Sequence, residues 1–124
     1  MEIEIGYTEL TSATINLLKD TFELFSCIDD EDARHGAEFG FAENGGEIVA
    51  ACQYVGNRIH LIQSKPGTGA GAALMDALKE HFGSDGIVAD NALKGAIPWY
   101  ESQGFEKGQR TFEGWDMIWY PDEA

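Results

Sequence analysis

Three glycines within five residues, Gly67, Gly69 and Gly71, separate a β-rich block from a helical segment. The residues that follow are apolar at helical spacing: Leu74, Ala77, Leu78 and Phe82. A short apolar stretch from Gly86 to Asp90 then indicates another strand. A strand, a glycine-rich turn, a helix and a strand form a βαβ unit, whose strands pair in parallel. The glycine run therefore predicts a sheet with one parallel pair.

The chain before the glycines predicts four strands and one helix. Residues 2–7 alternate polar and apolar side chains, which is typical of a strand, and helical spacing covers Ser12 to Phe25. Three strands follow, at residues 38–43, 47–55 and 58–63. Turn residues that tolerate positive φ separate these strands, so antiparallel hairpins are expected.

The chain after residue 90 predicts one short helix and two closing strands. Pro98 belongs in a first helical turn, so this helix begins close to Ile97 and ends at Gln103-Gly104. The closing strands are joined by a turn near Gln109 to Thr111. The predicted fold class is α/β (α+β), with a mostly antiparallel mixed sheet flanked by helices. Its 124 residues suit a single domain spanning 1–124.

The charge of the chain is strongly negative, with 22 Asp and Glu against 8 Lys and Arg, a formal net charge of −14. Such a surface repels phosphate backbones and anionic lipid, which argues against nucleic-acid and membrane partners. It attracts cations, including protonated amines. Acidity also keeps a small protein soluble, which is the plainer explanation.

The cysteines and histidines form no recognisable metal or disulfide pattern. Cys27 and Cys52 lie far apart in apolar contexts, so buried free thiols are expected. The three histidines are scattered, and no metal is predicted. The N-terminus has no secretory h-region and no apolar run is long enough to span a bilayer, so a cytoplasmic location is expected.

A glycine loop before a helix is suited to binding an anion, because free N–H groups and the positive helix end converge there. No Lys-Ser or Lys-Thr follows Gly67 to Gly71, so a nucleotide-triphosphate loop is excluded. The order Gly-x-Gly-x-Gly also differs from the dinucleotide fingerprint. A structural turn without a ligand is the alternative.

Two segments resemble the signature of the GCN5-related N-acetyltransferases. Residues 69–74 match that family's Gly-x-Gly loop and helix start, and residues 96–105 match its later segment ending in Tyr-x-x-x-Gly-Phe. The order of elements is also similar, and the short acidic form is similar to acetyltransferase-like proteins of bacteriophages. The resemblance implies the family fold, acetyl-CoA as co-substrate and an amine as acceptor. Proteins of this fold are often dimers, so a homodimer is an expectation.

The resemblance also implies roles for particular residues. Tyr100 is the expected general acid, because a phenol suits protonation of a departing thiolate. The strand from His60 would open away from its neighbour and pair its backbone with pantetheine. The expected coenzyme-binding residues are Leu61, Ile62, Gln63, Lys65, Gly67, Thr68, Gly69, Ala70, Gly71, Ala72 and Asn91.

The sequence departs from the family pattern at two of these places. Pro66 stands where the family usually has Gln or Arg, and Lys65 beside it is the expected replacement for that charge. Leu93 stands where the family has a common Asn, with Asn91 nearby.

The general base is left open between His60, Asp90 and a water chain to a carboxylate, and His60 also suits a half-buried strand. The function expected is direct acetyl transfer from acetyl-CoA to a cationic primary amine, either a small molecule or a protein lysine or N-terminus. Two alternatives remain. One is an inactive acyl-CoA-binding or protein-interaction module of the same fold, and the other is an acidic inhibitor that mimics nucleic acid.

Overall fold

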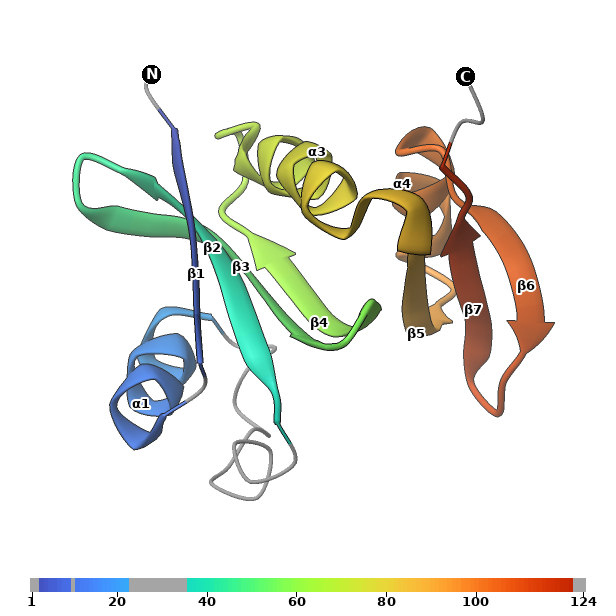
Figure 1. Cartoon of the computed structure of the whole chain (residues 1–124), viewed down its shortest axis with the longest axis horizontal. Helices are drawn as coiled ribbons and strands as arrows, with labels where there is room; N and C mark the ends of the chain where they lie inside the picture. Colours follow the sequence, from blue (N-terminus) through green and yellow to red (C-terminus); the bar gives the residue numbers. More distant parts are fainter. Residues whose placement is uncertain (1–2, 10, 23–35, 122–124) are drawn as a thin grey trace.

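A seven-stranded sheet with the order β1-β2-β3-β4-β5-β7-β6 organises the chain (Figure 1). The computed structural model describes residues 3–9, 11–22 and 36–121. The acidic run at residues 29–32, Cys27 and His35 lie outside these residues. The strands are β1 (Glu4–Glu9), β2 (Glu38–Asn44), β3 (Glu47–Val55), β4 (Arg58–Ser64), β5 (Ile87–Leu93), β6 (Glu106–Arg110) and β7 (Gly114–Trp119). The helices are α1 (Ser12–Thr21), α3 (Ala70–Phe82), the 3-10 turn η2 (Gly83–Asp85) and α4 (Ile97–Ser102).

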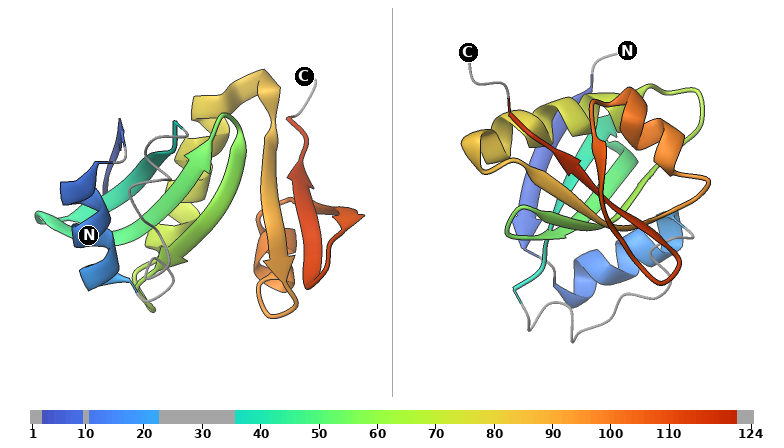
Figure 2. Two further views of the ribbon diagram at one scale, coloured as in Figure 1. Left: turned by 90° about the horizontal axis from the view of Figure 1, so that it is seen from below. Right: turned by 90° about the vertical axis from the view of Figure 1, so that its right-hand side faces the viewer.

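The predicted mixed sheet is confirmed, and its parallel pair is very short. Every neighbouring pair is antiparallel except β4 and β5, which pair in parallel only at Arg58 with Val88 and Ile59 with Ala89. Beyond those residues the two strands diverge, and Figure 2 shows them opening away from each other. The βαβ unit therefore leaves a gap in the sheet between β4 and β5.

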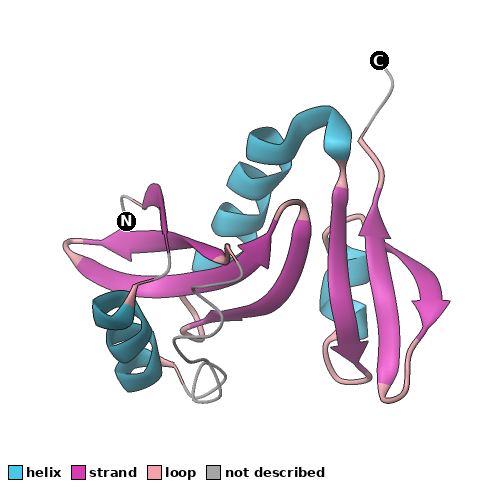
Figure 3. Ribbon diagram, turned by 60° about the horizontal axis from the view of Figure 1, so that its bottom comes forward, coloured by secondary structure: helices cyan, strands magenta, loops and turns pink. Residues whose placement is uncertain are grey.

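Two apolar clusters lie on opposite faces of the N-terminal strands. Ala50 and Cys52 on β3 face the cluster that includes α3, whereas Ala51 between them faces the cluster that includes α1. This alternation follows from the two-residue period of a strand. Helix α4 packs on β7, so the strands β5–β7 have their own helix on the far side of the gap (Figure 3).

Helix α1 is shorter than its apolar spacing predicted. It ends at Thr21, and Phe22 caps it with an extended backbone, φ −131° and ψ 128°. The Phe22 side chain remains buried beside Leu18 and Ile15. Its apolar character therefore reflects packing after the helix rather than another helical position, and the predicted residues 23–25 lie outside the described part.

The last hairpin turns later than predicted. Strand β6 continues to Arg110, and the turn covers residues 111–113. The Thr111 and Gly114 backbones close it, with the Thr111 N–H donating to the Gly114 carbonyl at 2.9 Å. Gly114 lies so close to β5 that a Cβ there would be 2.0 Å from the Ala92 carbonyl oxygen. The turn expected at residues 109–111 is wrong by two residues, because Arg110 still pairs with Trp115 in the β6–β7 ladder.

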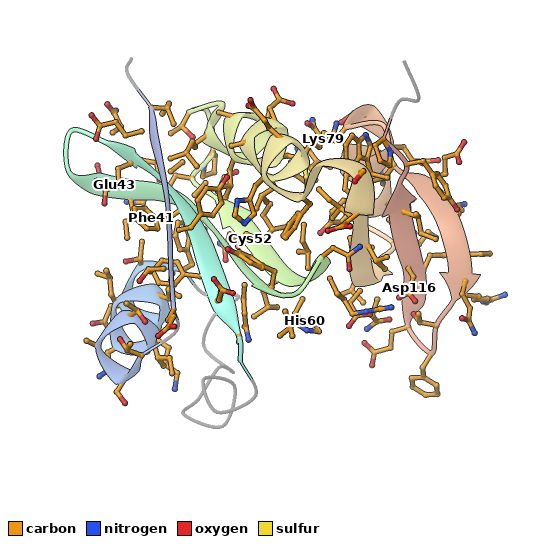
Figure 4. All side chains as sticks on the ribbon, viewed as in Figure 1. Phe41, Glu43, Cys52, His60, Lys79 and Asp116 are labelled. Carbon is orange, nitrogen blue, oxygen red and sulfur yellow. The ribbon has the colours of Figure 1, made fainter. Side chains whose placement is uncertain are left out.

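The α4 prediction is confirmed, with Pro98 in the first turn of the helix. Cys52 is a buried free thiol, as predicted, and Figure 4 shows it between the sheet and α3. No helix in the described part of the chain is long and apolar enough to cross a membrane.

Tyr54 provides a stability prediction, because its buried hydroxyl has no hydrogen-bond partner among the described residues. Burial, with a smaller contribution from Glu38, raises the pKa of this phenol above its ordinary value of 10.0. The folded state thus keeps a proton that the unfolded state releases, so stability is complete below pH 10 and falls as the pH rises towards the raised value. Tyr54→Phe should raise the free energy of unfolding by about 1 kcal/mol and weaken this alkaline loss.

Urea unfolding of both proteins at neutral pH and above pH 10 measures the two effects. An earlier unfolding midpoint for Tyr54→Phe at neutral pH would show that the hydroxyl stabilises the fold.

Candidate functional site

Two β-bulges face each other across the gap between β4 and β5. On β4, Ile59 lies opposite Tyr54 and Leu61 lies opposite Gln53, so His60 is the extra residue. Ile59 and Ile62 consequently both pack towards α3, although three positions separate them. A bulge re-aims a side chain in this way. Figure 4 shows His60 pointing away from α3 at the edge of the gap.

The second bulge lies on β5. Ala89 pairs with Met117 and Ala92 with Trp115, so Asp90 and Asn91 together oppose the single residue Asp116. Asn91 has a positive φ of 48°, a conformation that Asn tolerates better than most residues. Its N–H donates to Asp116 Oδ1 at 2.9 Å, and its side-chain oxygen accepts a bond from the Thr111 hydroxyl.

The bulges bring Asp90 against two cationic or ionisable groups. His60 Nδ1 lies 3.0 Å from Asp90 Oδ2, and the Arg58 guanidinium donates to the other carboxylate oxygen. Asp116 lies 3.9 Å from the same Arg58 nitrogen. His60 is therefore oriented by a carboxylate whose second oxygen is held by arginine.

Two cavities open at this gap. The loop cavity, of about 220 Å³, is lined by Ile62, Gln63, Ser64, Gly71, Ala96, Trp99 and Tyr100. The histidine cavity, of about 340 Å³, is lined by His60, Leu61, Ile62, Asp90, Asn91, Ala92, Leu93, Ala96, Tyr100 and Glu113. Ile62, Ala96 and Tyr100 belong to both. The larger hollow of about 760 Å³ near η2 and Pro121 has none of the predicted site residues.

Tyr100 lies where the two cavities meet. Its side chain is largely buried, between the rings of Trp99 and Phe105. Burial raises the pKa of its phenol above the ordinary value. The hydroxyl forms no hydrogen bond with the described residues, so it remains protonated and free to donate.

The glycine loop has the geometry of an anion-binding helix start. Gly67 and Gly69 have φ of 76° and 69°, which explains why both are glycine. The Thr68 hydroxyl accepts from the Ala70 N–H at 3.2 Å and donates to the Lys65 carbonyl. The N–H groups of Gly71 and Ala72 have no acceptor among the described residues, as expected in a first helical turn.

Gly71 allows close approach between α3 and β4. A Cβ at this position would lie 2.8 Å from Ser64 Oγ and 3.6 Å from the Trp99 ring. Any larger side chain would occupy the loop cavity. The third glycine of the run is therefore required by proximity rather than by its backbone angle.

The structure separates some predicted residues from this site. The Lys65 ammonium forms an ion pair with Glu47, so it is engaged on β3 rather than at the loop. The Asn91 side chain is held by Thr111, and Asn91 lines the histidine cavity rather than the loop cavity. Lys65 lines neither cavity.

Several lining residues were not identified from the sequence. Trp99 lies on the same short helix as Tyr100, and Ala96 is the N-cap of that helix, so the predicted start of the helix was the signal for both. No signal in the sequence pointed to Ser64 or Glu113. Ser64 is the last residue of β4, and Glu113 lies in the β6–β7 turn, far along the chain.

Many solved structures share this fold. The N-acetyltransferase PaiA of Thermoplasma acidophilum, in complex with coenzyme A, has a TM-score of 0.66 at 12% identity, covering 97% of this chain and 99% of that one. A GCN5-related N-acetyltransferase of Rhodopseudomonas palustris has a TM-score of 0.63 at 16% identity, covering 95% and 94%. The N-acetyltransferase PseH of Campylobacter jejuni has a TM-score of 0.62 at 16% identity, covering 97% and 99%.

The chain therefore has the fold of the GCN5-related N-acetyltransferases, and the resemblance noted in the sequence is confirmed at the level of the fold. No protein-family profile matches the sequence, and no curated protein matches it.

Proposed function

We propose that the protein transfers an acetyl group from acetyl-CoA directly to a cationic primary amine, on a small molecule or on a protein lysine or N-terminus. The observation that carries this proposal is the pair of cavities joined at Tyr100. One reaches Gly71 at the start of α3, and the other reaches His60 and Asp90. A thioester in the first and an amine in the second would meet beside the Tyr100 hydroxyl.

The loop cavity and the neighbouring edge of β4 are suited to a long, anionic ligand. The free N–H groups at the start of α3 and the positive end of that helix favour a pyrophosphate. Gly71 leaves space that a side chain would fill. Beyond Ile59, β4 has no partner in β5, so backbone groups from Leu61 to Ser64 on that side can pair with the pantetheine amides.

His60, Asp90 and Tyr100 have different roles in the proposed reaction. Acetyl-CoA supplies the acetyl group as a thioester. His60 takes a proton from the incoming ammonium, and Asp90 holds the imidazole in position. The neutral amine then attacks the thioester carbonyl, and Tyr100 gives its proton to the departing sulfur as the new C–N bond replaces the C–S bond. The acylated nitrogen releases its second proton, which restores the Tyr100 phenol, and the proton held by His60 passes to solvent. Asp90 and Glu113 on the histidine cavity attract the cationic acceptor.

A second candidate function is an acyl-CoA-binding module without turnover. The ion pair between Lys65 and Glu47 favours it, because the loop then has Pro66 and no free side-chain cation from the described residues beside it. Coenzyme binding without acetyl transfer to any amine would identify this function.

Titration calorimetry with acetyl-CoA and with CoA tests the coenzyme site. Gly69→Asp should weaken binding by at least about tenfold, because its carboxylate lies where the pyrophosphate would bind. Gly69→Asn is the matched control, since it has nearly the same shape and also tolerates a positive φ, but carries no charge. A Cβ at Gly69 meets no atom within 4 Å, so neither variant is crowded.

If Gly69→Asp and Gly69→Asn bind CoA with equal affinity, the glycine loop is not part of the coenzyme site. Absence of binding by the unaltered protein would overturn the proposed function.

A further inference from the structure

A third cavity lies between the β5–α4 connection and the β6–β7 hairpin. This basic cavity, of about 330 Å³, is lined by Lys94, Lys107 and Arg110, together with Trp115 and Glu113. It therefore gathers three of the eight Lys and Arg residues of a chain whose net charge is −14. This local positive charge is unexpected in a chain with 22 acidic and 8 basic residues.

These three cations are not used in ion pairs. Arg58 and Lys65 bind Asp90 and Glu47, but none of the cavity's cations forms an ion pair with a carboxylate in the described part of the chain. Lys107 instead lies over the Trp115 ring, with Nζ 5.5 Å from its centroid. The basic cavity thus has three cations without an ion-pair partner in the described part of the chain and a single carboxylate, that of Glu113.

The basic cavity adjoins the histidine cavity. Glu113 lines both, and Leu93 of the histidine cavity directly precedes Lys94 of the basic one. An acceptor whose amine lies near His60 would therefore extend towards the three cations. A simple amine or a diamine would gain no affinity from the basic cavity, because like charges repel.

We propose that the acceptor is a zwitterion, whose anionic group binds Lys94, Lys107 and Arg110 while its amine faces His60. The proposal rests on the acetyltransferase function proposed above and narrows its substrate class. Carboxylate and phosphate share the chemistry that this cavity recognises. Arginine can bind either one through two parallel hydrogen bonds, and the lysines add point charges.

Binding to the full chain without coenzyme tests the cavity itself. The probes are 2-aminoethyl phosphate, β-alanine and n-propylamine, followed through the indole N–H signals of the tryptophans by NMR. Saturable shifts of Trp115, with Trp119 unmoved, are expected for the phosphate, the carboxylate or both, and not for n-propylamine. Which anion shifts Trp115 distinguishes the two chemistries.

Substitutions of the cavity's cations test whether they bind the anionic group of the probe. Lys94→Gln and Arg110→Gln should each weaken the responding probe by roughly tenfold. They should also raise its KM in the transfer reaction by a similar factor, with kcat unchanged. Lys19→Gln is the control, because Lys19 is an exposed lysine on α1.

Three results would overturn the proposal. If coenzyme binds but no anionic amine moves Trp115, this inference alone fails. If Arg110→Gln weakens CoA but not 3′-dephospho-CoA, the cavity serves the coenzyme phosphate instead. If the unaltered protein binds no coenzyme, the proposed function fails together with this inference.

Discussion

Tyr100→Phe is expected to lower kcat by about 10²- to 10⁴-fold while leaving coenzyme affinity unchanged, as loss of a general acid would. The substitution removes one hydroxyl, which forms no hydrogen bond with the described residues. The ring contacts with Trp99 and Phe105 are retained. Steady-state kinetics with acetyl-CoA and a responsive amine, together with calorimetric titration of CoA, measure the two quantities.

Tyr54→Phe is the matched control for this experiment. It removes the hydroxyl of another buried tyrosine, which lines neither the loop cavity nor the histidine cavity. Its kcat should equal that of the unaltered protein. If Tyr100→Phe also keeps full activity, the departing sulfur obtains its proton from another source and the assigned role of Tyr100 is wrong.

His60→Gln is expected to lower kcat/KM by about 10²-fold at neutral pH, because the ammonium of the acceptor then loses its base. The loss should shrink as the pH approaches the pKa of the acceptor amine, since a growing share of the amine is already neutral. Asp90→Asn should cause a smaller loss with the same pH dependence. Asp90 is a positioning residue, which acts through its contact with the His60 imidazole.

The pH profile separates these roles from structural ones. Asp90 also binds Arg58, so its replacement disturbs an ion pair as well as the imidazole. A disturbed fold would lower activity equally at every pH. A loss in His60→Gln that does not diminish at high pH would therefore rule out the base assignment, leaving a water chain to a carboxylate as the alternative.

Local patterns were sufficient to predict much of the fold. The order of helices and strands followed from periodicity and turn residues, and Pro98 correctly located the start of α4. The glycine run predicted the parallel pair, because a strand, turn, helix and strand have few ways to pack. Positions where apolar spacing had two explanations were less reliable. Phe22 is buried in an extended cap, and local sequence cannot distinguish it from a helical residue.

The site depended on contacts between distant segments. The resemblance to two family motifs in the sequence proposed Tyr100, Gly69 and Gly71 as site residues, and the structure places Tyr100 and Gly71 on the loop cavity. Only the tertiary structure decided that His60 meets Asp90, because two bulges on separate strands re-aim those residues across the gap.

Tertiary packing also decided which charges are available. Lys65 is adjacent to the glycine loop in sequence, yet its ammonium lies on Glu47 because β3 and β4 are neighbours in the sheet. Lys94 lies in the β5–α4 connection and Arg110 at the end of β6, and the β6–β7 hairpin brings them to one cavity. Sequence determined the backbone at each motif, whereas the partner of each charge was set by strand pairing, which joins residues far apart in the chain.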